Sequence, residues 1–161
     1  MKRNIKEFAQ TLRLPDAAAT EALGARIAAG IGPGDAIALE GDLGAGKTTL
    51  ARAILRALGV SGAIPSPTFT LVQHYETPKL PVSHYDLYRI EAAGELDELG
   101  LDDALAEGAA LIEWPALAMN RLPETTLHVR LKTVKDDIRQ VQLCGPQRWA
   151  ALLSESPADA G

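Results

Sequence analysis

The run "GDLGAGKTTL" (Gly41–Leu50) sets three glycines, a lysine and two threonines between two patterned segments. Before it, "AIALE" is a short, continuously apolar run, typical of a strand buried on both faces. After it, "ARAILRALG" repeats apolar residues at helical spacing and ends in a glycine, as helices often do. Gly41, Gly46, Lys47 and Thr48 match G-x-x-x-x-G-K-S/T, the P-loop pattern, in its expected context of strand and helix.

A P-loop holds phosphate groups. Its glycines let successive backbone N–H groups point inward without Cβ clashes, and the following helix adds the positive end of its dipole. We expect Lys47 to reach the β- and γ-phosphates and the Thr48 hydroxyl to ligate Mg²⁺. The sequence has no N/T-K-x-D element for reading guanine, so the predicted ligands are ATP and Mg²⁺. The predicted loop contacts are Gly41, Asp42, Leu43, Gly44, Ala45, Gly46, Lys47, Thr48 and Thr49.

Two acidic residues are candidates to complete this site. Asp86 ends the strand-like run "PVSHYD", and Glu113 ends "AALIE". A carboxylate at the end of a strand beside the P-loop can hold Mg²⁺ or its waters, and the sequence leaves open which acid does so and which orients the attacking water. The candidate catalytic residues are Lys47, Asp86 and Glu113, and the candidate metal ligands are Thr48, Asp86 and Glu113.

The rest of the chain alternates strand and helix patterns, which predicts an α/β fold. Strands are expected at residues 4–12, 68–76, 81–88 and 109–114, with a hairpin at 125–134 and 137–144. Further helices are expected at 14–30 with Asp16 as cap, at 92–107 with a break at Gly100, and at 145–153. The predicted architecture is P-loop NTPase-like, with a mostly parallel central sheet, added antiparallel strands and flanking helices. Residues 1–153 are expected to form a single P-loop ATPase domain, followed by a disordered tail at 154–161.

Composition limits the classes of function. The chain has 161 residues and a formal net charge of −5, whereas a protein that holds nucleic acid by itself normally carries a positive face. Nine acids from Asp86 to Glu113 are accompanied only by Arg89, and a basic run follows from Arg121 to Arg148. We interpret these runs as solvated faces, with two docking surfaces of opposite charge as the alternative.

The single cysteine, Cys144, excludes an internal disulfide and a cysteine-based zinc site. It lies in a strand-like run, where we expect it to be a small buried apolar residue. The start, "MKRNIKEFAQ", has no apolar core of a secretory signal, and no stretch approaches the roughly 20 apolar residues that span a bilayer. We therefore expect a cytoplasmic protein with no membrane partner.

Four further motifs follow the P-loop: "SPTFTLV" (Ser66–Val72), "HYDLYR" (His84–Arg89), "ELDELGL" (Glu95–Leu101) and "IEWP" (Ile112–Pro115). In order and spacing these motifs resemble the TsaE family, also called YjeE, from about Leu14 to Arg139. The resemblance implies a small bacterial ATPase required for making threonylcarbamoyladenosine in tRNA. It also implies a TsaB–TsaD complex as the partner, with tRNA held only through that complex.

The resemblance further implies roles for particular residues. Thr48 and Glu113 match magnesium-associated positions, and Asp86 matches a second essential acid. Ser66 and Thr68 fall in a loop similar to a switch I, placed to sense the γ-phosphate. The remaining matches are Trp114 beside the site, Pro15, Asp16 and Ala17 at the adenine, and Arg139 near the nucleotide. The family often has an acid after "IEWP", whereas Ala116 stands here, so the metal assignment at this strand rests on Glu113 alone.

Two other classes of function share a P-loop. A small-molecule kinase needs a lid with several arginines that closes on its acceptor, and the arginines here are scattered. A nucleotide-gated binding module without turnover would not need the two acids. The preferred hypothesis is therefore the ATPase, with slow hydrolysis alone and faster hydrolysis with the TsaB–TsaD complex.

Overall fold

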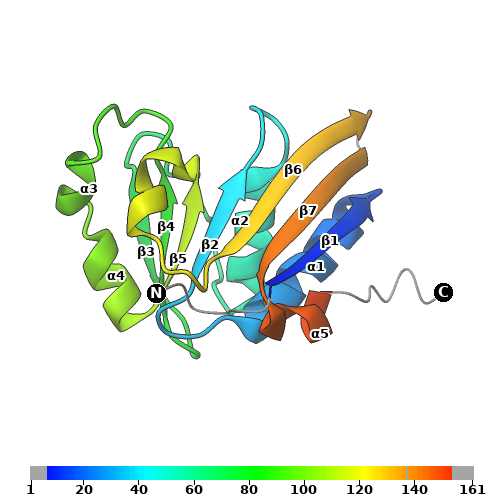
Figure 1. The fold of residues 1–161 in the computed structure, drawn as a ribbon, viewed down its shortest axis with the longest axis horizontal. Coiled ribbons are helices and arrows are strands. Elements are labelled where there is room, and N and C mark those ends of the chain that lie inside the picture. Colours follow the sequence, from blue (N-terminus) through cyan, green and yellow to red (C-terminus); the bar gives the residue numbers. More distant parts are fainter. Residues whose placement is uncertain (1–6, 137, 154–161) are drawn as a thin grey trace.

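A seven-stranded sheet forms the centre of the computed structural model, which describes residues 7–136 and 138–153 (Figure 1). The strand order is β1-β7-β6-β2-β5-β4-β3. The strands are β1 (Glu7–Leu14), β2 (Ala36–Glu40), β3 (Val72–Glu76), β4 (Pro81–Asp86), β5 (Ala109–Glu113), β6 (Leu127–Lys135) and β7 (Ile138–Pro146). The helices are α1 (Ala17–Gly30), α2 (Lys47–Ala57), α3 (Glu95–Glu98), α4 (Leu101–Glu107) and α5 (Ala150–Leu153), with 3₁₀ segments η1 (Pro115–Arg121) and η2 (Gln147–Trp149).

Strand direction brings three acidic residues to one edge of the sheet. β2 pairs in parallel with both β5 and β6, and β4 pairs in parallel with β5. The antiparallel pairs are β3 with β4, β7 with β6, and β1 with β7. Glu40, Asp86 and Glu113 therefore end neighbouring parallel strands at the edge where such sheets bind ligands.

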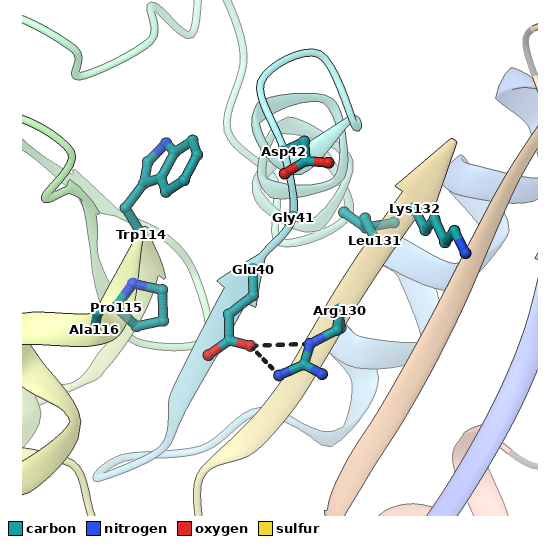
Figure 2. A pocket seen from close by; sticks show the side chains of 9 residues that line it. All are labelled: Glu40, Gly41, Asp42, Trp114, Pro115, Ala116, Arg130, Leu131 and Lys132. Carbon is teal, nitrogen blue, oxygen red and sulfur yellow. Dashed lines mark hydrogen bonds and ion pairs between the residues drawn. The ribbon is translucent and has the colours of Figure 1, made fainter. Parts of the chain in front are cut away.

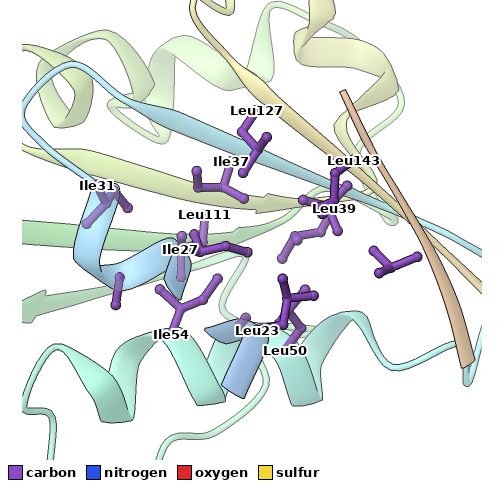
Figure 3. Close-up of a cluster of buried hydrophobic side chains, with 14 of the residues drawn as sticks. Leu23, Ile27, Ile31, Ile37, Leu39, Leu50, Ile54, Leu111, Leu127 and Leu143 are labelled. Carbon is purple, nitrogen blue, oxygen red and sulfur yellow. The ribbon is translucent and has the colours of Figure 1, made fainter. Parts of the chain in front are cut away.

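One face of the sheet is covered by α1 and α2. Ile27 of α1 and Leu50 and Ile54 of α2 pack against Leu39 and Leu111 of the central strands, and all five side chains are fully buried (Figure 3). Burial of each such side chain stabilises the fold by about 1.5–3 kcal/mol. The apolar spacing of α2 thus fixes the helix that begins at the P-loop lysine against the central strands.

The other face carries a second, smaller core beneath α3 and α4. Leu96 and Leu101 of these helices pack with Tyr85 of β4 and Ile112 of β5. Ile112 and its neighbour Leu111 belong to different cores because successive residues of a strand point to opposite faces. Burial on both faces explains why "AALIE" reads as an unbroken apolar run.

Most of the predicted architecture is confirmed, including the α/β class, the parallel strands at the centre of the sheet, the added antiparallel strands and the flanking helices, and the seven-stranded sheet as a whole is mixed. Asp16 caps α1 by accepting a hydrogen bond from the Ala19 amide at 2.9 Å. Gly100, with a φ of 68°, separates α3 from α4 as expected.

Several boundaries differ from expectation. The strand expected from residue 68 begins at Val72, because Leu71 has a φ of 70° and donates its amide to the Pro67 carbonyl at 2.8 Å in a turn. The strand expected at 4–12 is β1, which extends to Leu14. Residues 4–6 lie outside the described residues, as does the predicted tail at 154–161.

The C-terminal segment also departs from expectation in two ways. The helix expected at 145–153 is the 3₁₀ turn η2 followed by the single turn of α5, since Gly145 and Pro146 still belong to β7. Cys144 is exposed, and the prediction that it is buried is wrong. Val141 and Leu143 take the inward positions of β7, so alternation turns Cys144 toward solvent.

None of the helices in the described ranges combines the length and apolar character needed to cross a bilayer.

Candidate active site

The predicted P-loop connects β2 to α2 and needs glycine at two points. Gly41 has a φ of 146°, and a Cβ there would lie 2.5 Å from the Leu131 carbonyl oxygen, so no other residue fits. Gly46 has a φ of 104° and caps α2. Because Gly46 has no side chain to accept from the first amides of α2, these amides remain available to an anion at the positive end of the helix.

The Lys47 side chain lies within the loop and is only 5% exposed. Its ammonium donates to the carbonyl oxygens of Gly41 at 2.5 Å and Asp42 at 2.9 Å, and lies 4.1 Å from the centre of the Trp114 ring. Burial lowers the pKa of Lys47 below its ordinary value of 10.5, against the opposing effect of nearby carboxylates, with Glu113 the strongest. The lysine is therefore a desolvated cation, suited to meet phosphate charge.

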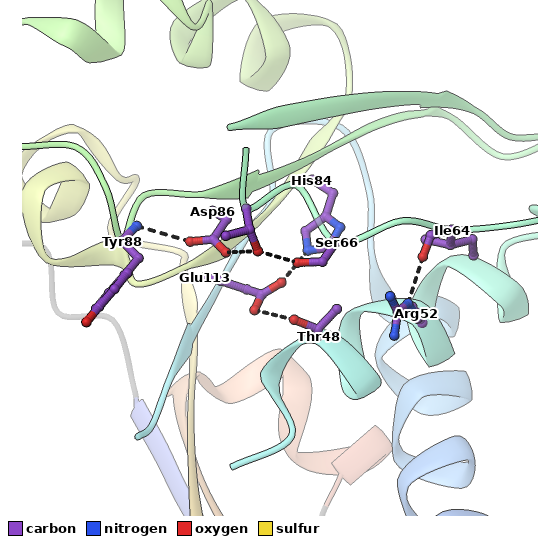
Figure 4. A network of polar contacts seen from close by, with 9 residues as sticks. Thr48, Arg52, Ile64, Ser66, His84, Asp86, Tyr88 and Glu113 are labelled. Carbon is purple, nitrogen blue, oxygen red and sulfur yellow. Dashed lines mark hydrogen bonds and ion pairs between the residues drawn. The ribbon is translucent and has the colours of Figure 1, made fainter. Parts of the chain in front are cut away.

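Glu113 is the centre of a short polar chain (Figure 4). The Thr48 hydroxyl donates to Glu113 Oε1 at 2.7 Å, which joins the first turn of α2 to the end of β5. The other oxygen, Oε2, lies 2.7 Å from Nε2 of His84 on β4. Glu113 and His84 are both buried. The structure thus brings together Thr48 and Glu113, two of the predicted metal ligands.

Asp86, the second acid, faces the loop that follows Pro65. Its Oδ1 accepts the Tyr88 amide at 3.0 Å, and its Oδ2 accepts a long hydrogen bond of 3.4 Å from the Thr68 hydroxyl. Thr68 is in turn 2.7 Å from the Ser66 hydroxyl. Ser66 and Thr68, predicted from the family resemblance to form a switch-like loop, therefore contact the candidate catalytic acid through one hydroxyl.

A small hollow of about 190 Å³ lies on the α1 side of the loop. Six predicted nucleotide contacts line it, namely Asp16, Ala17, Ala45, Gly46, Thr49 and Arg139. Arg139 also donates to the Gly44 carbonyl at 3.3 Å, which ties β7 to the P-loop. Pro15 is exposed and is not part of this lining.

A larger hollow of about 460 Å³ lies on the opposite side of the loop (Figure 2). Asp42 and Trp114 line it, and an ion pair between Glu40 and Arg130 at 3.0 Å forms part of its wall. Trp114 has a φ of 56°, an uncommon conformation for a residue other than glycine. Its ring packs against that of Tyr88, with the ring centres 4.7 Å apart and the planes inclined by 46°, so the tryptophan lies between Tyr88 and Lys47.

Some residues of the site escaped prediction. His84 shares a strand face with Asp86, and this two-residue spacing was the available signal that it also faces the site. Tyr88 follows two residues after Asp86, but only the fold brings its ring to Trp114. Thr20 and Leu131 line the small hollow without any motif that would mark them.

Oxygen donors in this arrangement suit magnesium. Within residues 7–136 and 138–153, no group of three or more His, Cys, Asp or Glu side chains is arranged to hold a metal ion alone. Mg²⁺ is usually bound by one or two carboxylates and completes its shell with waters and substrate phosphates. The Thr48 hydroxyl bonded to Glu113, with Asp86 opposite Glu113 on the neighbouring strand, fits that mode of binding.

The chain is similar to proteins of one family. The family model described as "Threonylcarbamoyl adenosine biosynthesis protein TsaE" matches residues 14–141, a range that holds the P-loop, both acids and Arg139. The tRNA threonylcarbamoyladenosine biosynthesis protein TsaE of Bacillus subtilis is 41% identical over 137 residues, covering 84% of this chain and 85% of that protein. Its namesake from Streptomyces coelicolor is 37% identical over 138 residues, covering 80% and 92%. The crystal structure of YdiB from Bacillus subtilis matches with a TM-score of 0.75 and 30% identity, over 99% of this chain and 100% of that one.

Proposed function

Because the chain belongs to the TsaE family of threonylcarbamoyl adenosine biosynthesis proteins, we propose that it binds and hydrolyses ATP in support of threonylcarbamoyladenosine formation in tRNA. The observation that carries the ATPase proposal is the 2.7 Å hydrogen bond from Thr48, the last residue of the P-loop pattern, to Glu113 at the end of β5. A hydroxyl and a carboxylate joined at this point are the groups with which P-loop enzymes hold magnesium.

ATP would bind across the P-loop. The backbone amides of Gly41–Thr49 and the start of α2 would cradle the phosphates, and Lys47 would meet the β- and γ-phosphates. The base would occupy the small hollow, between Asp16 and Ala17 on one side and Arg139 on the other. Its volume of about 190 Å³ is small, but it opens directly beside the loop residues Ala45 and Gly46.

Magnesium would be held by Thr48, Glu113 and Asp86 together with phosphate oxygens and waters. When bound, the ion would neutralise charge that develops on the phosphate oxygens during hydrolysis. Asp86 also contacts Thr68, so a change at the phosphates would be felt by the loop at Ser66–Thr68. This contact supports a switch-like role for the loop.

A partner surface at the same edge supports action with a TsaB–TsaD complex. Five large apolar side chains are conspicuously exposed in the described structure, and four of them lie in the P-loop, in the switch-like loop, just after β4 or near the end of β6. They are Leu43, Phe69, Tyr88, Met119 and Val134, with exposed fractions from 40% for Met119 to 82% for Phe69. Apolar surface gathered beside a catalytic edge is typical of a protein interface. The net charge of −5 fits a protein that meets tRNA only through that complex.

Phosphate release from ATP, measured with and without the TsaB–TsaD complex, tests the proposal. We expect slow release alone and faster release with the complex, because a partner can order the switch-like loop or supply charge to the transition state. Glu113→Gln and Asp86→Asn should each reduce hydrolysis far more than ATP affinity, since these carboxylates act as charge develops. Hydrolysis that ignores the complex, or that survives both substitutions, would contradict the proposal, and phosphorylation of a small acceptor would favour a kinase.

Phe69 allows the partner surface to be tested apart from the chemistry. Phe69→Ala removes the exposed ring and should reduce stimulation by the complex while leaving hydrolysis by the isolated protein unchanged. Phe69→Tyr keeps the ring and serves as the matched control. Equal stimulation of the alanine variant and the wild type would place the docking surface elsewhere.

A further inference from the structure

The imidazole of His84 is fully buried behind Glu113. The proposed function gives this residue no role. Its exposed fraction is 0%, and Nε2 lies 2.7 Å from Glu113 Oε2. Its other nitrogen, Nδ1, is also buried and has no hydrogen-bond partner in the part of the chain that the structure describes. The contact with Glu113 is therefore the one hydrogen bond that the described residues give this buried imidazole.

The bonding pattern assigns the proton on this ring. Glu113 Oε2 is an acceptor, so Nε2 must carry the hydrogen that it shares. His84 thus donates its Nε2–H to the buried carboxylate of Glu113.

This contact completes a clamp on Glu113. His84 holds Oε2, and the Thr48 hydroxyl holds Oε1, both at 2.7 Å. With a donor on each oxygen, the carboxylate cannot turn about its terminal bond without breaking a hydrogen bond in a buried place. The oxygen that faces α2 is therefore always presented to the threonine at the P-loop.

Packing alone does not account for His84. Val82 lies two residues earlier on the same face of β4 and fills its part of the core with a purely apolar side chain. An apolar residue at position 84 would avoid the cost of a buried, unpaired nitrogen. Histidine is useful there only because it can donate to Glu113.

We propose that His84 is a positioning residue for the magnesium–nucleotide site, acting through the orientation of Glu113. The inference rests on the proposed function, because it assigns His84 to the same site. Removal of a residue that hydrogen-bonds to a metal ligand typically lowers metal affinity or activity by about 10- to 100-fold.

Three variants of the full chain separate this role from packing. His84→Leu removes the donor and keeps apolar bulk, His84→Gln keeps an N–H donor on a side chain of similar reach, and Val82→Ala removes core volume without touching Glu113. Titration calorimetry measures the affinity for ADP in Mg²⁺ and in EDTA. The ratio of these two affinities is the magnesium gain. Thermal melting of each variant reports its fold.

We expect the magnesium gain to fall by about 10- to 100-fold in His84→Leu while affinity in EDTA stays unchanged. His84→Gln should restore most of the gain, and Val82→Ala should melt lower than the wild type yet keep the full gain. In wild-type protein without nucleotide, ¹⁵N NMR of the imidazole should show a hydrogen on Nε2, the nitrogen that faces Glu113.

A full magnesium gain in His84→Leu, an equal loss in Val82→Ala, or an Nε2 that carries no hydrogen would overturn the inference and leave the proposed function intact. A wild-type protein whose ADP affinity ignores magnesium would overturn the proposed function and this inference together. The NMR measurement needs neither ligand nor variant, so the result stands even where His84→Leu fails to fold.

Discussion

Burial of the charged Lys47 side chain within the P-loop lowers the stability of the folded chain. Burial lowers the pKa of its ammonium, so folding disfavours the charged form although the carboxylates of Glu113, Asp86 and Asp42 oppose the shift. Between the folded pKa and 10.5, the unfolded chain binds more protons than the folded one, and stability rises with pH. Below the folded pKa, the full penalty of burying the charge is present.

Lys47→Met should therefore separate stability from binding. The substitution removes the cation that faces the phosphates, so ATP binding should be lost, while the nucleotide-free protein should melt no lower than wild type. In a chain of 161 residues, each 1 kcal/mol recovered raises the melting temperature by about 2–4 °C. Calorimetric titration and thermal melting measure the two effects.

Two results would contradict this reasoning. Wild-type ATP affinity in Lys47→Met would remove the basis for the P-loop assignment. A melting temperature well below wild type would show that the contacts of the ammonium with two carbonyls and the Trp114 ring outweigh its desolvation.

At the scale of residues, prediction from sequence works where chemistry follows chain order. The P-loop is contiguous, and Asp86 and Glu113 are marked because each ends a predicted strand. The contact of His84 with Glu113 joins residues on different strands, and it depends on a register that pairs Asp86 with Glu113. No local pattern encodes that register, so the contact could not be predicted.

The helices α1 and α2 approach each other closely at Gly24. A Cβ on Gly24 would lie 2.6 Å from the Cβ of Ala53 and 2.9 Å from its carbonyl carbon. Real structures do not hold atoms at such distances, so the helices touch here only because one residue has no side chain. The same approach fixes Asp16 and Ala17, at the start of α1, beside the P-loop.

Gly24→Ala should destabilise the protein even though alanine favours helices. Overpacking typically costs about 1–3 kcal/mol, which exceeds the helix propensity gain of about 1 kcal/mol. Urea unfolding measures the change, and adding Ala53→Gly to this variant removes the contact between the two Cβ atoms but not the 2.9 Å contact with the backbone, so it should restore only part of the loss. A gain in unfolding free energy for Gly24→Ala would show that the helices shift apart without cost.

Arg52 links α2 to the segment that leads into the switch-like loop. Its Nε donates to the Ile64 carbonyl at 2.7 Å, whereas Arg56, one turn later, donates to the Val60 carbonyl at 3.0 Å. Arg52→Met should therefore speed amide hydrogen exchange across Ser66–Thr70, since the carbonyl that holds the loop to the helix loses its donor. Arg56→Met is the matched control, and equal acceleration in both variants would argue against a specific link.

At the scale of elements, patterns identified type better than boundaries. The alternation in "TFTLVQHYE" predicts a strand from residue 68, but the Thr68 hydroxyl bonds to Asp86 and the chain turns at Leu71 before the ladder begins. The alternation of apolar and polar residues along the sequence carries no information about such a tertiary contact. The same limit explains Cys144, where alternation was visible but its phase was misjudged.

The charge of the whole molecule predicts its behaviour toward tRNA. With a net charge of −5, the isolated protein should show no saturable tRNA binding tighter than about 10 µM at physiological salt of about 0.15 M. Fluorescence anisotropy of labelled tRNA measures this, and the TsaB–TsaD complex, which is proposed to hold tRNA, is the positive control. Submicromolar binding by the isolated protein would contradict the proposal that tRNA is held only through the complex.

The sheet order marks where prediction from sequence ends for the molecule as a whole. Alternating patterns were enough to indicate an α/β fold, because β2, β5 and their helices read as a P-loop unit. The position of β1 beside β7, at the far edge from β3, depends on contacts between distant parts of the chain. Several orders satisfy the same pattern, so only the folded structure distinguishes them.

The pairing of β1 with β7 also determines when the sheet can be completed during synthesis of the chain. Glu7 lies opposite Pro146 and Leu14 opposite Arg139. The strand β1 therefore cannot pair until β7 has been synthesised. Translation delivers the P-loop well before β7, because chains emerge from the ribosome N-terminus first. Until β7 arrives, Asp16 lacks Arg139 across the small hollow. Under the proposed function, a chain without β7 lacks one wall of the hollow proposed for the base, so nucleotide binding should reach full strength only when the sheet is complete.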